Sequence, residues 1–394
     1  MKTIITNGTV LRDGEALQNH SVLMENGLIT AVLPRELLPQ EDATVIDAKG
    51  GYISAGWIEL HSHGIAGEDF MDADPAGMVR ALQDYARHGV TGVYPTTLSA
   101  PFEEIRRSLD AMATIKDDQS GATFLGAHLE GPYFAPAQRG AQPLEALCTP
   151  ADKEYERLLK DFPFIARIDT APELAGSAEL ADFMKAHGKI CGIAHTDANA
   201  EVICNAKEGQ YPIATHLYSG MSGVHRENGH RIAGAVEGCL LRDDIFCETI
   251  CDGIHLPKEL LKLIYKVKGA EKMILVSDSI RGAELPESST FIMGNRETGY
   301  EAFVSEGVAW VPDHSAYAGS VATYDRLIRT AVTVADIPLT DAVRMATETP
   351  ARVMGLANKG RLEPSFDADI TVFDENYSVL YTIVGGRIVY TKGE

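Results

Sequence analysis

The sequence predicts an α/β protein that combines a (β/α)8 TIM-like barrel with a small β-sandwich domain formed from both chain ends. Residues 54–355 alternate apolar strands with helices, and eight such strands can be counted. The two ends, residues 1–53 and 356–394, instead carry short strands separated by turn signals. Most of the eight strands also end in a histidine or an acidic residue, at the edge where barrels place their chemistry.

Composition excludes several classes of protein. The 394 residues are 45% hydrophobic and 23% charged, which is typical of a globular chain. No apolar run reaches the roughly 18 residues of a membrane helix, and residues 1–7 lack the basic start of a signal peptide, so we expect a cytoplasmic protein without a membrane partner. A net charge of −21 argues against nucleic acid as a partner. The six dispersed cysteines are expected to be buried thiols.

The strands of the two ends come first and last along the chain. Strands are expected at residues 3–6, 10–11, 20–24 and 28–33, and again at 370–373, 379–384 and 387–391. Asn7-Gly8, Asp13-Gly14 and Asn26-Gly27 have the composition of tight hairpin turns. We therefore assign residues 1–53 and 356–394 to the small domain and residues 54–355 to the barrel.

The barrel strands are expected at residues 57–63, 90–97, 123–130, 164–170, 189–195, 211–217, 245–252 and 272–278. A helix over 75–88 is predicted by Asp74 as its cap and Pro75 in its first turn. Other helices are expected to start at Thr149-Pro150 and at Pro257. Near-continuous apolar strands indicate a parallel sheet covered on both faces. An open doubly wound sheet is the alternative, but its GxGxxG signature is missing after the first strand.

Candidate metal ligands stand at the carboxyl ends of these strands: His61, His63, Glu130, His195 and His216. A single histidine at a strand end is usually a hydrogen-bonded core residue. Several imidazoles buried together with a carboxylate are costly unless a divalent cation satisfies them. This donor set suits Zn²⁺, with Fe²⁺ or Mn²⁺ as alternatives. Three ligands (Glu130, His195 and His216) leave a position for water, while His61 and His63 could hold a second ion.

Asp278 ends the last of the eight strands. A carboxylate beside the metal can take a proton from a water molecule and return it to a departing amine. The alternative role is an ordinary cap for the next loop. We expect Asp278 to be the catalytic acid/base.

Segments that carry these residues resemble the amidohydrolase superfamily and, within it, the deacetylases of N-acetylglucosamine 6-phosphate. The matching segments are residues 56–64, 128–133, 170–173, 194–197, 215–218, 252–255, 276–278, 318–320, 342–352, 360–364 and 368–370. The resemblance covers essentially the whole chain. It implies a barrel with a split β-sandwich, a centre of one or two metal ions and the ligand and acid/base roles given above.

The resemblance also implies substrate-binding residues. Phosphate would be held by His255, by the backbone at Ser219 and Gly220, and by Arg226, with Arg226 and His255 acting across a homodimer interface. The sugar would be lined by Ala141, Gln142, Tyr317, Ala318 and Gly319. Two positions depart from the family pattern: Ser219-Gly220 stands where Asn-Ala is usual, and Gln142 stands where many members have histidine.

The function expected from these residues is hydrolysis of the amide of an N-acetylated amino-sugar phosphate, foremost N-acetylglucosamine 6-phosphate. One alternative keeps the site and changes the substrate to N-acetylgalactosamine 6-phosphate or another N-acyl amine. The other is a noncatalytic barrel that serves as a scaffold. The complete set of ligands and acid favours an enzyme over a scaffold.

Overall fold

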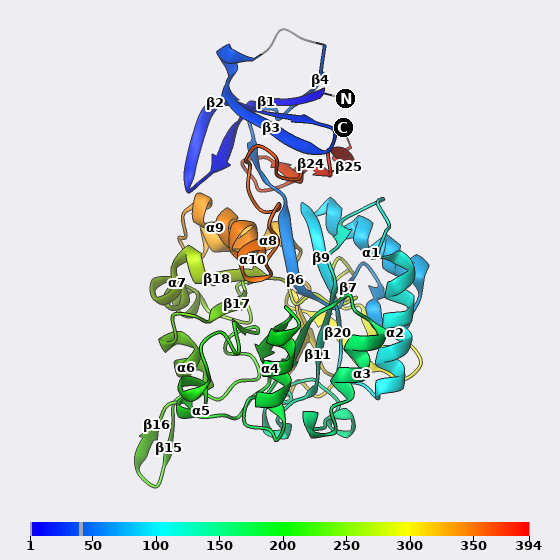
Figure 1. Ribbon diagram of the computed structural model, residues 1–394, viewed down its shortest axis with the longest axis vertical. Coiled ribbons are helices and arrows are strands. Elements are labelled where there is room, and N and C mark those ends of the chain that lie inside the picture. The colour runs from blue at the N-terminus through cyan, green and yellow to red at the C-terminus, as the bar shows by residue number, and fades with distance from the viewer. Residues whose placement is uncertain (1, 39–41, 394) are drawn as a thin grey trace.

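The computed structural model describes residues 2–38 and 42–393. Residues 1, 39–41 and 394, which the sequence analysis assigns to the small domain, lie outside the described residues. Figure 1 shows a small β-sheet at one end of the molecule, where both chain termini lie, and an α/β barrel below it.

The small sheet is built from both ends of the chain. Its strands are β1 (Lys2–Arg12), β2 (Glu15–Glu25), β3 (Leu28–Pro34), β4 (Thr44–Asp47), β5 (Tyr52–Ala55), β23 (Ile370–Phe373), β24 (Val379–Val384) and β25 (Arg387–Thr391). They run in the order β25-β24-β23-β5-β1-β2-β3, and β4 pairs with β1. Buried Val10, Ile53 and Ile370 belong to its core. The separate β unit is confirmed; its predicted boundary after residue 53 falls within β5 and stays a prediction.

The predicted turn at Asn7-Gly8 is wrong. Strand β1 runs through both residues, and its pairing with β2 shifts register on either side of Gly8. Asn7 has a φ of 60°, which asparagine tolerates, and a Cβ at Gly8 would lie only 2.8 Å from Ala48 and from the Gly51 carbonyl. The pair therefore forms a β-bulge, and the chain reverses later, at Asp13-Gly14.

The barrel strands are parallel and nearly closed. They are β6 (Trp57–Ser62), β9 (Val90–Thr97), β11 (Ala127–Tyr133), β12 (Ile165–Thr170), β13 (Ile190–Ile193), β14 (Ile213–Ala214), β17 (Phe246–Ile250) and β18 (Met273–Val276), with the short β10 (Thr123–Phe124) beside β9. Closure occurs through a parallel bridge between Ser62 and Ser279. This arrangement confirms the predicted fold class and excludes the open doubly wound sheet.

The helices are α1 (Pro75–Arg87), α2 (Phe102–Ile115), α3 (Glu154–Asp161), α4 (Ser177–Ala186), α5 (Ala200–Asn205), α6 (Ala235–Leu241), α7 (Lys258–Lys272), α8 (Tyr324–Thr333), α9 (Leu339–Ala346) and α10 (Glu348–Val353). Asp74 caps α1 by accepting from the backbone of Ala76 and Gly77, as expected. At the predicted start at Thr149-Pro150 there is instead a short 3-10 helix, Pro150–Asp152, which precedes α3. Among the described residues, no helix has the length and apolar character to cross a membrane.

Three smaller elements extend the barrel. A four-stranded sheet comes after β18: β19 (Thr290–Met293), β20 (Tyr300–Ser305), β21 (Val308–Trp310) and β22 (Tyr317–Gly319). A short hairpin of β7 (Gly64–Ile65) and β8 (Glu68–Asp69) comes after β6. Strands β15 (His225–Glu227) and β16 (His230–Ile232) form a hairpin that projects from the end of the molecule opposite the small sheet (Figure 1).

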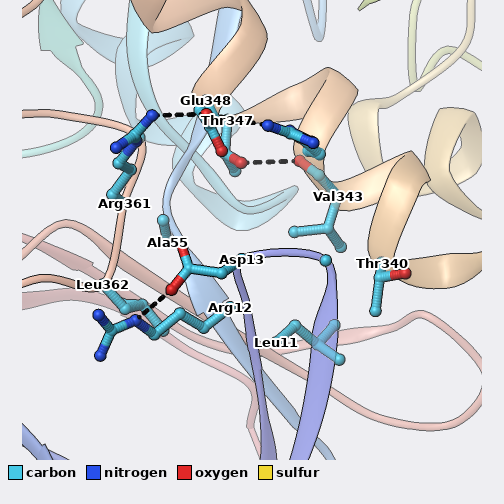
Figure 2. Close-up of a pocket in the computed structure, with 13 residues that line it drawn as sticks. Leu11, Arg12, Asp13, Ala55, Thr340, Val343, Thr347, Glu348, Arg361 and Leu362 are labelled. Carbon is cyan, nitrogen blue, oxygen red and sulfur yellow. Dashed lines mark hydrogen bonds and ion pairs between the residues drawn. The ribbon is translucent and has the colours of Figure 1, made fainter. Parts of the chain in front are cut away.

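A hollow lies where the β1–β2 turn meets α9 and the segment after α10 (Figure 2). Its polar wall is organised by Glu348, which accepts from Arg361 at 2.6 Å and from Arg344 at 3.2 Å. One carboxylate on α10 thus binds an arginine on α9 and another on the segment that leads to β23. Since Arg361 is partly exposed, these pairs contribute modestly to stability and mainly orient the junction.

A partly buried histidine joins three elements of the barrel wall. His88, at the end of α1, lies 3.0 Å from Asp325 of α8 and 2.8 Å from Glu284 in the loop after β18. Burial alone would lower the pKa of His88, but the two carboxylates outweigh it and raise the pKa from 6.5 to about 9. The charged imidazole therefore stabilises the folded state.

We expect His88→Gln to lower the free energy of unfolding in a pH-dependent way. Because the folded pKa is above the unfolded value, the stabilisation is complete below about pH 6.5 and is lost as pH rises through about 9. The difference between wild type and variant should therefore fall by up to about 3 kcal/mol between pH 6 and pH 10, as measured by urea unfolding. The exposed His187→Gln is the control. A difference that does not change with pH would contradict the assignment.

Candidate active site

The predicted ligands come from strands spread around the barrel and meet at its carboxyl-end mouth. His61 is in β6, with His63 directly after it, and Glu130 is in β11. His195, His216 and Asp278 come within two residues after β13, β14 and β18. All six are buried or nearly so, and the five ligand candidates are at most 7% exposed.

Glu130 lies at the centre of the group. Its Oε1 is 3.1 Å from Nε2 of His195, 2.9 Å from Nε2 of His216 and 3.7 Å from Nε2 of His61. Its Oε2 is 3.3 Å from Nε2 of His63. The two carboxylate oxygens therefore face different histidines, which is the arrangement a carboxylate needs to bridge two ions.

Asp278 also lies beside the Nε2 atoms of His61 and His63. Its Oδ1 lies 3.4 Å from Nε2 of His61 and 3.3 Å from Nε2 of His63. The two Nε2 atoms are themselves 3.3 Å apart. Asp278 is thus within reach of anything bound between these histidines and also lines the open cavity.

Three of these residues have strained backbones. His195, His216 and Asp278 have φ values of 44°, 29° and 48°, a region that residues with a Cβ rarely adopt. Surrounding hydrogen bonds hold two of them: the Asp278 amide donates to the His61 carbonyl at 3.0 Å, and the His195 carbonyl accepts from Ala135 at 2.9 Å. Such strain is concentrated at functional sites, because the turn aims the side chain into the mouth instead of along the strand.

The electrostatics of the group call for positive charge at its centre. Burial would raise the pKa of Glu130, but His61, His195 and His216 hold it well below its usual value. Burial would likewise raise the pKa of Asp278, and the facing His61 and His63 lower it instead. Conversely, burial would lower the pKa of His216, which Glu130 raises to about 9. Both carboxylates are held ionised, and His216 binds a proton where a divalent cation could supply the charge.

The donor set fits a divalent metal. Ligand atoms of His61, Glu130 and His216 lie within 4.8 Å of one another, and so do those of His61, His63 and Asp278. The Nδ1 atoms of His61 and His216 are buried without a hydrogen-bond partner among the described residues, and each Nε2 faces Glu130. Imidazole nitrogen with carboxylate oxygen and no thiolate is the pattern of catalytic zinc and related ions.

A cavity of about 210 Å³ opens beside this group. It is lined by His63, Glu130, His195, His216 and Asp278, and also by predicted substrate-binding residues: Ala141, Gln142, Ser219, Gly220, His255, Tyr317, Ala318 and Gly319. The structure therefore brings the expected sugar-lining residues to the same space as the candidate ligands.

Gln142 is tied to the protein at both ends of its side-chain amide. Its Nε2 donates to Oε2 of Glu130 at 2.6 Å, and its Oε1 accepts from the Ser99 amide at 2.9 Å. It is only 4% exposed. Gln142 thus orients the central carboxylate in addition to lining the cavity.

His255 and Arg226 have different positions. His255 lines the cavity, and its Nδ1 donates to Asp252 at 2.7 Å. Arg226 lies in β15 on the projecting hairpin, where it is exposed and outside the cavity lining. The described chain alone does not bring Arg226 to the cavity, so its predicted phosphate role depends on a second subunit.

A buried charged cluster beneath the ligands was not predicted. It consists of Glu59, His128, Arg167, Asp169 and Glu248, all on barrel strands and at most 1% exposed. Burial raises the pKa of Glu59 to about 8. Burial would also raise the pKa of Glu248, but Arg167 lowers it to about 2. One indication of this cluster was present in the sequence: charged residues stand inside otherwise apolar strands. Such residues are rarely buried unless their charges are paired.

Comparison with known proteins shows similarity over essentially the whole chain. Residues 52–389 match the amidohydrolase family. An N-acetylglucosamine-6-phosphate deacetylase from Lysinibacillus sphaericus is 30% identical over 394 residues, which cover 98% of each chain. An N-acetylgalactosamine-6-phosphate deacetylase from Escherichia coli O157:H7 is 27% identical over 94% of this chain and 95% of the relative. The crystal structure of N-acetylglucosamine-6-phosphate deacetylase from Pasteurella multocida superposes with a TM-score of 0.90 at 26% identity and full coverage of both chains.

We expect Zn²⁺ to raise the melting temperature of protein that has been stripped of metal with a chelator. An ion that binds only the folded state stabilises it, by about 2.7 kcal/mol at 100 times the dissociation constant. Glu130→Gln should remove most of the shift, because Glu130 faces the histidines through both oxygens. The exposed Glu297→Gln is the matched loss of a carboxylate and should respond like wild type. An equal shift in Glu130→Gln would exclude Glu130 as a ligand.

Proposed function

The chain belongs to the amidohydrolase family, and we propose that it is a metal-dependent deacetylase that converts N-acetylglucosamine 6-phosphate to glucosamine 6-phosphate and acetate. The predicted family resemblance is confirmed by the comparisons. The observation that carries the function is the meeting of His61, His63, Glu130, His195, His216 and Asp278 at the mouth of the barrel, where all of them except His61 line one cavity. Relatives of near-equal length with this reaction in their names support the substrate class.

In this proposal Glu130, His195 and His216 would hold the first ion, and His61 and His63, together with Glu130, would hold a second. Zn²⁺ is the proposed ion. A divalent ion held there would polarise the amide carbonyl, lower the pKa of a water molecule and stabilise negative charge on the oxygen. Two observations support a second ion. The Nε2 atoms of His61 and His63 are 3.3 Å apart, and the second carboxylate oxygen of Glu130 faces His63.

Asp278 is the proposed acid/base. An amide is a weak electrophile and an amine is a poor leaving group, so the reaction needs a proton removed from water and then delivered to the amine nitrogen. Asp278 is ionised, because His61 and His63 hold its pKa down against burial, and it faces the cavity. It can therefore accept the first proton and return it to the departing nitrogen.

The remaining cavity residues would position the sugar phosphate. His255 is held by Asp252, which fixes the direction of its ring, and Ser219 and Gly220 line the same cavity. We assign the sugar to Ala141, Gln142 and the Tyr317, Ala318 and Gly319 strand. In a homodimer, Arg226 would reach the phosphate group of substrate bound in the neighbouring subunit. Its guanidinium can pair with two phosphate oxygens at once. The cytoplasmic location predicted from the sequence remains a prediction.

The rival with a specific observation in its favour is N-acetylgalactosamine 6-phosphate, because a relative of similar length carries that activity in its name. The two sugars differ in configuration at a single carbon. Residues that face the sugar, and not the metal ligands, must decide between them.

An acetate-release panel tests the function. We expect turnover of N-acetylglucosamine 6-phosphate to exceed that of N-acetylgalactosamine 6-phosphate in kcat/KM, and both to exceed that of the unphosphorylated sugars. A phosphate contact is a charge-assisted interaction, and its loss should cost at least about tenfold. Protein with Glu130→Gln is the inactive control. Release of acetate from the galactosamine compound at the higher kcat/KM would establish the rival, and release from neither would refute the proposal.

The acid/base role is tested by Asp278→Asn. The amide keeps the shape but cannot accept a proton, so kcat should fall by about 10²–10⁴-fold while KM changes little. Metal content should be measured on the same preparation, because Asp278 also lies beside His61 and His63. A variant that retains both metal and near-normal kcat would show that another group moves the proton.

A further inference from the structure

The charged cluster beneath the ligands is too costly to be explained by stability alone. Arg167 is 1% exposed and donates to Asp169 at 2.7 and 3.0 Å and to Glu248 on its other side. A buried ion pair usually stabilises a fold no better than apolar residues of the same volume would. The pairing of two carboxylates with one guanidinium inside the barrel therefore suggests that this cluster has a role other than stabilising the fold.

The cluster contacts the candidate ligands at His61, through the side chains of Glu59, His128 and Glu248. Oε2 of Glu248 lies 3.5 Å from Nδ1 of His61, the buried nitrogen that has no hydrogen-bond partner among the described residues. The opposite nitrogen of the same ring, Nε2, faces Glu130 and Asp278. His61 thus lies between the cluster and the proposed metal centre.

The other members of the cluster are already satisfied. Asp169 accepts from Arg167, from Thr215 at 2.7 Å and from His128 at 2.9 Å. Glu248 is fixed by Arg167 through both of its oxygens, with Oε2 also directed toward His61. The ring of His128 meets the ring of His61 edge-on, with centroids 4.8 Å apart, which leaves His61 little freedom to turn.

We propose that Glu248, anchored by Arg167, is a positioning residue that holds His61 with its proton on Nδ1 and its free Nε2 directed at the second metal position. A carboxylate behind a ligating histidine fixes the tautomer and the ring direction and strengthens the ligand. The inference rests on the proposed function, because it assumes that His61 binds metal. It adds that occupancy of the second position depends on a residue that touches neither metal nor substrate.

The test is a metal titration of the full chain. Metal-free wild type and Glu248→Gln are titrated with Zn²⁺ by calorimetry, and bound zinc is counted by elemental analysis after dialysis. We expect Glu248→Gln to bind the first ion as wild type does and the second about 10–100-fold more weakly. Asp325→Asn removes another carboxylate from a partly buried histidine, His88, away from the cavity, and should bind both ions normally. Glu248→Asp keeps the charge and should give a smaller loss, which keeps the test usable if Glu248→Gln folds poorly.

A double-mutant cycle separates positioning from general damage. If Glu248 acts through His61, adding Glu248→Gln to His61→Asn should change zinc affinity no further. Equal binding of both ions by wild type and Glu248→Gln would overturn the inference while leaving the proposed function intact, and so would a further loss of affinity in the His61→Asn background. The inference assumes that the wild-type protein binds two ions. Binding of fewer than two ions by the wild type would therefore also overturn it, and with it the proposed two-ion site.

Discussion

Closure of the barrel between β6 and the segment after β18 is the constraint on which the site depends. The Asp278 amide donates to the His61 carbonyl at 3.0 Å, and the His63 amide donates to the Ser279 carbonyl at 2.7 Å. These backbone bonds join the first barrel strand to the last and set the register of one against the other. These two backbone hydrogen bonds therefore keep Asp278 next to His61 and His63 at the mouth of the barrel.

Closure of the barrel buries several ionisable groups close together. Their charges are paired in two layers, one at the mouth and one deeper in the barrel. At the mouth, Glu130 and Asp278 are matched by histidines. One layer deeper, Arg167 matches Asp169 and Glu248. An unpaired buried charge in either layer would destabilise the fold. Loss of one partner in a layer is therefore expected to disturb the residues of the other layer as well. The backbone strain at His195, His216 and Asp278 is supported by the same rigid strands.

Periodicity and local chemistry were enough to predict the elements whose ends are set by their own residues. Strands β9, β23, β24 and β25 begin and end where their apolar runs do, and α1 starts after its cap at Asp74. Strand β14 is shorter than its apolar run, because the positive φ at His216 turns the chain out of the sheet. The Asn7-Gly8 bulge was missed, since a composition that allows positive φ does not distinguish a turn from a bulge. The Glu248–Arg167 pair was missed because its partners are 81 residues apart and no motif links them.

The two departures from the family pattern have unequal consequences. Gln142 donates to Glu130 and accepts from the Ser99 amide, so much of its hydrogen-bonding capacity is used within the protein. A histidine at this position has only two ring nitrogens and could not make both of these contacts while also facing a sugar. Ser219 is different: within the described chain its side chain makes no hydrogen bond to another residue, and it lines the cavity. Sugar preference should therefore depend more on Ser219 and the Tyr317, Ala318 and Gly319 strand, whereas Gln142 belongs functionally with Glu130.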